Sequence, residues 1–195
     1  MTQPPPILRS IIYRKIKQPR ALICVKTSPH TEKTSVITEI KQEIPQGYQA
    51  VSVQFQRSNN ALTSSDRLFQ WFCTQITQQL QLKNTLAESW QEGISSKMNC
   101  SNYFETYLLP NIKTALVIVL YNVELILEYQ AIANNFFELL RSWHNNAANE
   151  NGWEKLRLVI VHSQDISLTG NVPFNVGVLI KFREPEAGQS CFAYL

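Results

Sequence analysis

The chain has 195 residues, of which 44% are hydrophobic and 17% charged, as is typical of one globular domain of about 100–200 residues. The net charge of +3 is too small to indicate nucleic acid as a partner, and no block of Lys and Arg residues occurs. The first residues lack the apolar segment of a secretion signal, and the longest unbroken apolar run covers only 115–121, whereas a membrane-spanning helix needs ~20 residues. We therefore expect a cytoplasmic protein with no membrane partner.

The cysteines are far apart in the sequence, and none forms a C-x-x-C pair, so neither a zinc site nor a dithiol motif is indicated. They are Cys24, Cys73, Cys100 and Cys191. Cys24 and Cys73 lie within apolar runs and are expected to be buried thiols, because free cysteine behaves as a small hydrophobic residue. Such thiols are typical of a reducing compartment.

The chain begins with a proline-rich segment, 1–6, that we expect to be extended and mobile, within a flexible leader that covers 1–10. The segment 7–16 is either a short amphipathic helix or the entry to the domain. The apolar run at 21–26 is followed by turn residues and predicts a buried strand. Apolar residues at helical spacing predict a helix over 33–44, which Pro45 ends.

The middle of the chain predicts one strand and two helical regions. The segment 48–55 alternates in polarity and is rich in residues that favour strands. A continuous apolar stripe predicts a helix over 65–82. A second helical region covers 86–109, is interrupted near residue 95, and ends at Pro110.

The C-terminal part contains the most apolar strands. The run 115–121 is apolar on both faces, as a central parallel strand requires, and 156–163 has the same character. Between them, 131–147 predicts a helix. We expect a loop at 165–175 and a last strand at 176–182.

This order predicts an α/β fold, a three-layer α/β/α sandwich around a mostly parallel, five-stranded sheet. Ligands in such sheets bind beyond the carboxyl ends of the strands. The turn that follows the first predicted strand, 27–35, is therefore the first place to look for a site.

A phosphate-binding loop reads G-x-x-x-x-G-K-[ST], in which backbone N–H groups and the lysine bind phosphates and the hydroxyl ligates Mg²⁺. The pattern maps onto 27–34, with Lys33 and Thr34 in the correct positions and both glycines absent. Glu32 replaces the last glycine and adds a carboxylate where phosphates would lie. Two like charges ~4 Å apart repel by ~1 kcal/mol in water and by several-fold more in a drier site.

A second motif of hydrolytic P-loop proteins is an Asp, often followed by a Glu, at the end of a central apolar strand, where they hold Mg²⁺ and activate water. Tyr121 and Asn122 occupy these positions. Asn122 could orient a water molecule but cannot act as its base. Glu124 is acidic, but we expect it to lie past the tip of the strand. Together with the altered loop, these residues argue against Mg²⁺-dependent hydrolysis.

The chain, with these two altered motifs, resembles the AAA-like domain of P-loop ATPases found in cyanobacterial multidomain proteins. The resemblance covers roughly 11–182, and its landmarks are RALICVKTSPHTEKTSVI, ALVIVLYNVELILEY, FFELLRSWHNNAANENGWEKLRLVIVHSQD and PFNVG. It implies a leader at 1–10, an AAA-like P-loop domain at 11–182, and a short tail at 183–195 that could reflect truncation.

The resemblance also implies roles for individual residues. The family loop ends in Met-Gly-Lys-Thr-Ser, which implies a nucleotide-binding segment formed by Thr31, Glu32, Lys33, Thr34 and Ser35, for ATP or ADP with Mg²⁺ at Thr34. The family's metal strand ends in Leu-Asp-Glu-Val-Asp. Asn122 and Glu124 fall at positions of this metal strand. Ser163 falls at the polar position that senses the γ-phosphate in AAA-type ATPases. The resemblance therefore makes Asn122, Glu124 and Ser163 the candidate catalytic residues.

Three functions remain open. The first is a degenerate domain, a pseudo-ATPase that does not hydrolyse ATP and serves as a scaffold or regulatory module for other protein modules or through self-association. The second is a working ATP-binding switch or ATPase, as the family implies. The third, association with nucleic acid, is disfavoured by the weak charge. The aromatic residues at helical spacing are expected to form core rather than stack on bases; they are Trp71, Phe72, Phe104, Tyr107, Phe136, Phe137 and Trp143.

Overall fold

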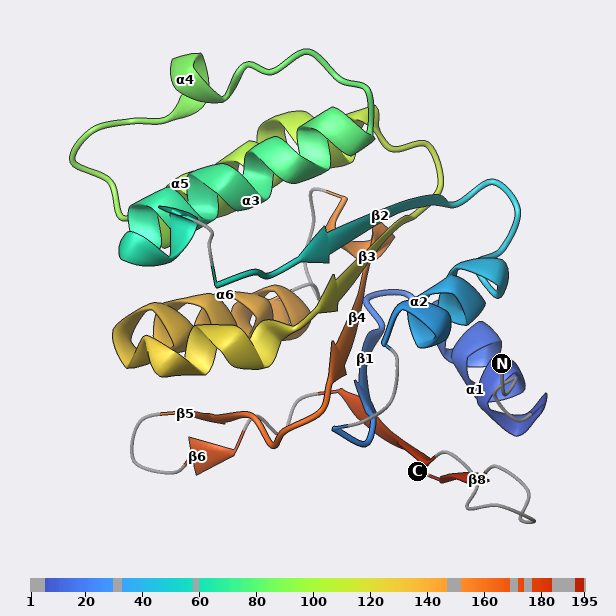
Figure 1. Ribbon diagram of the computed structural model, residues 1–195. Helices are drawn as coiled ribbons and strands as arrows, with labels where there is room; N and C mark the ends of the chain where they lie inside the picture. Colours follow the sequence, from blue (N-terminus) through green and yellow to red (C-terminus); the bar gives the residue numbers. More distant parts are fainter. Residues whose placement is uncertain are drawn as a thin grey trace.

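The computed structural model (Figure 1) describes residues 6–29, 33–57, 60–146, 152–168, 172–173, 177–183 and 192–194. Within these residues one sheet of six strands forms the centre of the molecule, in the order β2-β3-β4-β1-β7-β8. Its strands are β1 (Leu22–Lys26), β2 (Gln49–Gln54), β3 (Leu116–Tyr121), β4 (Leu156–His162), β7 (Val178–Arg183) and β8 (Phe192–Tyr194).

The strands from β2 to β7 in this order are all parallel, which confirms the predicted five-stranded parallel sheet. β8 adds a sixth strand and pairs antiparallel to β7. Two adjacent interior strands, β3 and β4, are buried along almost their whole length. Their continuous apolar character follows from this position, because helices cover both faces of a parallel sheet.

The helices form a layer on each face of the sheet, as predicted (Figure 1). One layer contains α1 and α2, and the other contains α3, α5 and α6. The helices are α1 (Pro6–Ile16), α2 (Lys33–Gln42), α3 (Ser65–Gln79), α4 (Leu86–Ser89), α5 (Ser96–Tyr103) and α6 (Gln130–Asn146). None of the described helices is long and apolar enough to cross a membrane.

Side chains alternate between the two faces along each strand and so divide the core in two. On β1, Ile23 and Val25 face the α1–α2 layer. Leu22 and Cys24 face the layer of α3, α5 and α6. The second core is the larger and contains most of the aromatic residues, with Phe136 among them, so their predicted role as core residues is confirmed.

The local sequence of helix α3 determines where the helix begins and which of its faces is buried. The side chain of Ser64 accepts a hydrogen bond from the backbone N–H of Arg67 and caps the first turn. Leu68, Phe72 and Ile76 then recur every four residues and are fully buried. The stripe therefore predicts both the helix and the face that it presents to the sheet.

The predicted elements differ from the structure in four places. The expected loop at 165–175 contains β5 (Ser167–Leu168) and β6 (Val172–Pro173), which pair antiparallel. Helix α1 begins at Pro6, so the predicted boundary at residue 10 lies inside this helix. The predicted tail contains β8. Strand pairing over so few residues is specified by the partner strand, which local sequence does not reveal.

The fourth difference is the helical region expected at 86–109, which is divided into short pieces. After α4 and a non-helical segment come α5, a π-helical turn and a 3-10 turn. The π-helical turn is Phe104–Leu108 and the 3-10 turn is Leu109–Asn111. Pro110 lies in the last of these and ends the region, as predicted.

The exposed edge of the sheet at β2 is covered by a side chain. Gln79 accepts a hydrogen bond from the backbone N–H of Ser52 and donates one to the Ser52 carbonyl oxygen, both at 2.8 Å. An amide thus replaces the backbone of a neighbouring strand, which protects an edge that could otherwise pair with another chain.

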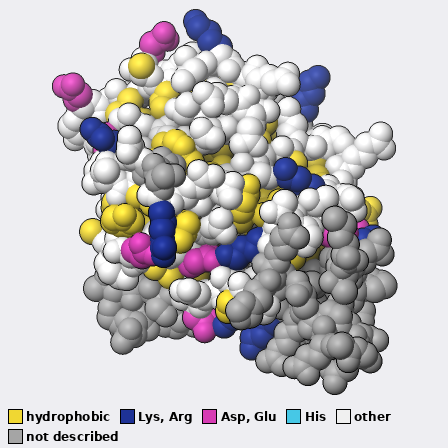
Figure 2. All heavy atoms as spheres, in the orientation of Figure 1, with side chains coloured by type: hydrophobic (Ala, Val, Ile, Leu, Met, Phe, Trp, Pro, Cys, Tyr) yellow, Lys and Arg dark blue, Asp and Glu magenta, His cyan; other side chains and the backbone are white. Residues whose placement is uncertain are grey.

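On the face of the molecule shown in Figure 2, basic side chains are interspersed with acidic and apolar ones.

Candidate functional site

The candidate site lies at the carboxyl edge of the parallel sheet, where β1, β3 and β4 end next to one another. The chain leaves β1 at Lys26 and enters α2 at Lys33. It leaves β3 at Tyr121 and β4 at His162. Residues just beyond these three strands can therefore meet although they are far apart in the sequence.

Four of the predicted site residues come together at this edge. The amino group of Lys33 forms an ion pair with Oε1 of Glu124 and donates a hydrogen bond to Oδ1 of Asn122 at 3.1 Å. The hydroxyl of Ser163 donates to the same oxygen of Glu124 at 2.7 Å. Only 16% of the Lys33 side chain and 8% of the Glu124 side chain are exposed, so the pair is largely shielded from water.

The position of Glu124 corrects the expectation that it lies beyond the tip of the strand. Asn122 adopts a left-handed backbone conformation, with φ of 59°, and begins the 3-10 turn Val123–Glu128. Asparagine tolerates this conformation better than most residues. The turn folds the chain back at the end of β3, and Glu124 thereby returns to Lys33.

The remaining predicted site residues do not join this cluster. Thr31 and Glu32 lie outside the described residues. Thr34 and Ser35 are exposed in the first turn of α2. Tyr121 is half-buried and its hydroxyl donates to the side chain of Gln54 at 3.3 Å, away from Lys33.

The entry to the loop after β1 is anchored to β4, a contact that the sequence did not indicate. The backbone N–H of Thr27 donates to the carbonyl oxygen of His162 at 2.8 Å, and the Thr27 hydroxyl lies 3.3 Å from the same oxygen. The His162 ring is buried, which lowers its pKa. Its Nδ1 lies 2.8 Å from the carbonyl oxygen of Gln164 and donates to it, because a carbonyl oxygen only accepts.

Glu124 is ionised in this cluster. Burial raises the pKa of Glu124, but the hydrogen bonds from Lys33 and Ser163 and the positive charge of Lys33 outweigh it. The net pKa therefore lies below the ordinary value of 4.5. Lys33 and Glu124 are consequently a charged, hydrogen-bonded pair at neutral pH.

The lowered pKa predicts a pH dependence of stability. A carboxyl group whose pKa is lower in the folded protein stabilises the fold above its unfolded pKa, and this stabilisation is lost as the pH falls through the folded pKa. We expect the stability difference between the wild type and Glu124→Gln to be constant near neutral pH and to shrink below about pH 4.5. Urea unfolding of both proteins between pH 7 and pH 3.5 measures it, and a difference that grows on acidification would contradict the assignment.

The described residues fit a magnesium–nucleotide complex poorly. Mg²⁺ is usually bound through one or two carboxylates together with waters and phosphate oxygens. Glu124 is the acidic member of the cluster, and its Oε1 already accepts from Lys33 and Ser163. Its Oε2 is buried without a hydrogen-bond partner in the described structure. No group of three or more His, Cys, Asp or Glu residues suited to a metal occurs in the part of the chain that is described.

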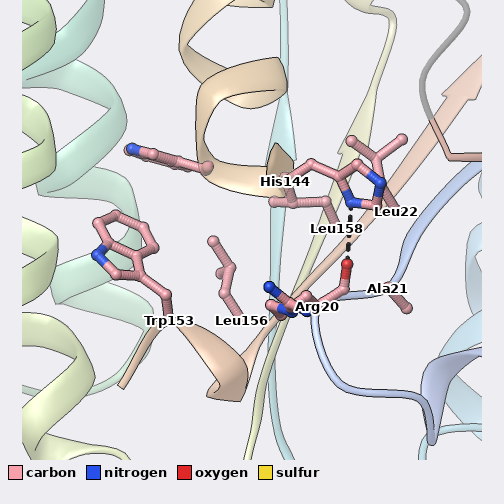
Figure 3. Close-up of a pocket in the computed structure, with 8 residues that line it drawn as sticks. Arg20, Ala21, Leu22, His144, Trp153, Leu156 and Leu158 are labelled. Atoms are coloured by element: carbon pink, nitrogen blue, oxygen red, sulfur yellow. Dashed lines mark hydrogen bonds between the residues drawn. The ribbon is translucent and has the colours of Figure 1, made fainter. Parts of the chain in front are cut away.

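A separate small pocket lies at the opposite, amino-terminal end of β1 (Figure 3). It is bordered by Arg20, His144 and Trp153, and His144 Nδ1 lies 3.1 Å from the Arg20 carbonyl oxygen. Its volume of about 10 Å³ matches roughly one water molecule. It is too small for a nucleotide.

Comparison with known proteins supports this fold. The family model of the AAA-like domain matches residues 4–191. The solved structure of the Aeropyrum pernix ORC2 protein in its ADP form is similar with a TM-score of 0.59 at 13% identity, over 91% of this chain and 46% of that one.

A structure of Drosophila ORC bound to AT-rich DNA and Cdc6 matches with a TM-score of 0.45 at 10% identity, over 82% of this chain and 44% of that one. This chain thus spans about half the length of the solved structures that it matches. Identities this low show similarity of fold alone. No curated protein matches the chain. The match over nearly the whole sequence, together with the parallel sheet and the lysine at its carboxyl edge, shows that the chain belongs to the AAA-like domain family.

Proposed function

We propose that this AAA-like domain does not hydrolyse ATP and acts as a scaffold or regulatory module, through other protein modules or a second copy of itself. The observation that carries the proposal is the buried ion pair between Lys33 and Glu124. The lysine that would bind phosphate in an active relative is neutralised by a carboxylate of its own chain. Its charge is used to stabilise the fold.

Electrostatics argue against simultaneous binding of a phosphate at this lysine. A phosphate that reaches Lys33 would lie close to the Glu124 carboxylate, with which Ser163 also forms a hydrogen bond. Two like charges at ~4 Å repel by ~4 kcal/mol at an effective dielectric constant of 20. Glu32 adds a further carboxylate to the same loop.

The end of β3 is also poorly suited to hydrolysis, because the carboxylate that returns there, Glu124, is held by an ion pair with Lys33 and a hydrogen bond from Ser163. A general base for water must accept a proton, and the amide of Asn122 cannot do so. The Asn122 side-chain oxygen instead accepts a hydrogen bond from Lys33. Tyr121 occupies the position of the first carboxylate and points its hydroxyl toward Gln54.

One observation favours the alternative, a nucleotide-binding switch. Lys33, Asn122, Glu124 and Ser163 are gathered at the edge of the sheet where P-loop proteins bind phosphates. An anion that displaced Glu124 would find the lysine and the serine already in place. This function requires Glu124 to move away from Lys33 when the nucleotide binds.

Calorimetric titration with ATP and ADP, with and without Mg²⁺, distinguishes the two functions. We expect weak or no binding by the wild type at millimolar nucleotide and a gain of at least about tenfold in Glu32→Gly, because a glycine removes both the charge and the Cβ from the loop. Glu124→Gln should bind more tightly as well. Glu128→Gln is the matched control, since it removes a charge from an exposed ion pair with Arg57 outside the cluster.

Three results of these measurements distinguish the two functions or exclude a simple charge effect. Equal, tight binding by the wild type and Glu32→Gly would show that the loop tolerates Glu32 and would favour the switch. Mg²⁺-dependent ATP turnover by the wild type, lost in a folded Lys33 variant, would overturn the proposal. A gain in Glu128→Gln equal to that in Glu32→Gly would assign the effect to net charge alone.

A further inference from the structure

Two cysteines from different helices are in contact within the larger core. Cys73 lies on α3 and Cys100 lies on α5, and their Sγ atoms are 3.5 Å apart. Both residues are fully buried. The sequence predicted burial for Cys73, but it contained no sign that Cys100, 27 residues further on, would be its neighbour.

We propose that Cys73 and Cys100 form an oxidisable thiol pair whose disulfide links α3 to α5. A disulfide requires an S–S distance of about 2.05 Å, so the two sulfur atoms need to approach by roughly 1.5 Å from their present contact distance. The sulfur atoms already touch, so this approach requires only a local adjustment of the two helices.

The surrounding contacts keep the two helices in register. One turn after the cysteines, the Thr77 hydroxyl and the Tyr103 hydroxyl are hydrogen-bonded to each other at 3.2 Å. The Thr77 hydroxyl also lies 2.8 Å from the Cys73 carbonyl oxygen. The same faces of α3 and α5 therefore contact at two successive levels, which limits how far the sulfur atoms can move apart.

The bond would restrain a segment that borders an open groove. The chain between the two cysteines includes α4, and Asn84, Leu86, Ala87 and residues 90–94 form one side of a groove of about 620 Å³. Asp66 and Gln70 of α3 form the other side. A disulfide would tie α3 to the far end of this segment, so oxidation would reduce the freedom of the groove as well as stabilise the domain.

The chemistry balances with a small-molecule disulfide as the oxidant. The thiolate of one cysteine attacks the oxidant, forms a mixed disulfide and releases one small thiol. The thiolate of the second cysteine then attacks the protein sulfur of the mixed disulfide and releases the second small thiol. The two protein thiols lose two electrons and two protons, and the oxidant gains both.

Burial sets the rate of this reaction. Burial raises the pKa of Cys100, and the contact with Cys73 raises it further. The thiolate is the reactive form, so the first attack requires a transient separation of α3 from α5 that admits water and oxidant. We therefore expect slow oxidation that accelerates in low concentrations of urea.

Oxidised glutathione tests the proposal on the full chain. After incubation and removal of the oxidant, we expect mass spectrometry to show loss of two hydrogens and a peptide in which Cys73 is joined to Cys100. The oxidised protein should unfold at a Tm higher by roughly 5–10 °C, and dithiothreitol should reverse the change.

Single cysteine variants test whether the cross-link is formed by Cys73 and Cys100 and not by the other cysteines. Cys73→Ala and Cys100→Ser should each abolish the cross-link and the rise in Tm. Cys24→Ala is the matched control, because Cys24 is also buried, with its pKa raised to about 12 by burial, yet it should leave both effects unchanged. The Cys191→Ala background removes a thiol that lies outside the described residues.

Two results would overturn the proposal, and neither depends on the variants being folded. One is the absence of the joined peptide in wild-type protein under conditions in which a thiol reagent labels both cysteines. The other is a joined peptide accompanied by a lower Tm, which would mean that the native arrangement of α3 and α5 does not accommodate the bond.

Discussion

Replacing Lys33 with methionine should destabilise the domain by about 2–4 kcal/mol at pH 7, because removing one partner of a buried ion pair leaves the other charge without compensation. The charge left behind is that of Glu124, whose side chain is only 8% exposed. Methionine keeps the length and apolar stem of the side chain, so the loss measures the charge and not a cavity. Urea unfolding at pH 7 provides the measurement.

A double-mutant cycle assigns this effect to the pair. The double variant Lys33→Met/Glu124→Gln has no unpaired carboxylate at this position. It should therefore recover part of the lost free energy of unfolding, with a coupling energy of about 1–3 kcal/mol. Lys97→Met is the control, because Lys97 pairs with Glu138 at the surface and should change stability by less than about 1 kcal/mol. Additive effects of the two site substitutions would mean that the ion pair contributes nothing to the fold.

This stabilising role affects how nucleotide binding is tested. A variant that removes Lys33 weakens the fold and any phosphate contact at once, so loss of binding alone would not identify the lysine as a ligand. Glu32→Gly avoids this difficulty, because it removes negative charge from the loop and leaves both Lys33 and Glu124 in place. Glu124→Gln also retains Lys33 but breaks the ion pair, so its binding is compared only after its stability has been measured. The gain or absence of binding in Glu32→Gly is therefore the more direct result.

Replacing Phe136 with alanine should cost about 3–5 kcal/mol, the range for truncating a fully buried aromatic residue in a packed core. Phe136 is fully buried on α6. Its ring is 5.4 Å from that of Phe55, 5.5 Å from that of Phe72 and 6.2 Å from that of Phe69, measured between centroids. Truncation would leave a cavity between α6, α3 and the segment that follows β2, and close packing prevents these neighbours from fully closing it.

Thermal or urea unfolding of Phe136→Ala provides the measurement, and Tyr129→Ala is the matched control. Tyr129 immediately precedes α6 and is 40% exposed, so its truncation should cost less than about 1 kcal/mol. Equal effects of the two substitutions would contradict the assignment of Phe136 to the core. A stable Phe136→Ala protein that had lost affinity for nucleic acid would instead favour a base-stacking role for this ring.

Much of the architecture follows from local patterns in the sequence. The continuous apolar runs of β3 and β4 indicate strands covered on both faces, and the four-residue spacing of Leu68, Phe72 and Ile76 predicts α3 and its buried side. The altered phosphate loop is likewise visible in the sequence, because Glu32, Lys33 and Thr34 follow a predicted strand at a fixed spacing.

The tertiary structure decided the contacts that carry the function proposed here. Lys33 and Glu124 are 91 positions apart, and they meet because β1 and β3 end at the same edge and Asn122 turns the chain back in a left-handed conformation. Cys73 and Cys100 meet because α3 and α5 pack on the same face of the sheet. Residue spacing along a strand or helix determines which side is buried, whereas the order of strands and the packing of helices determine which buried groups become neighbours.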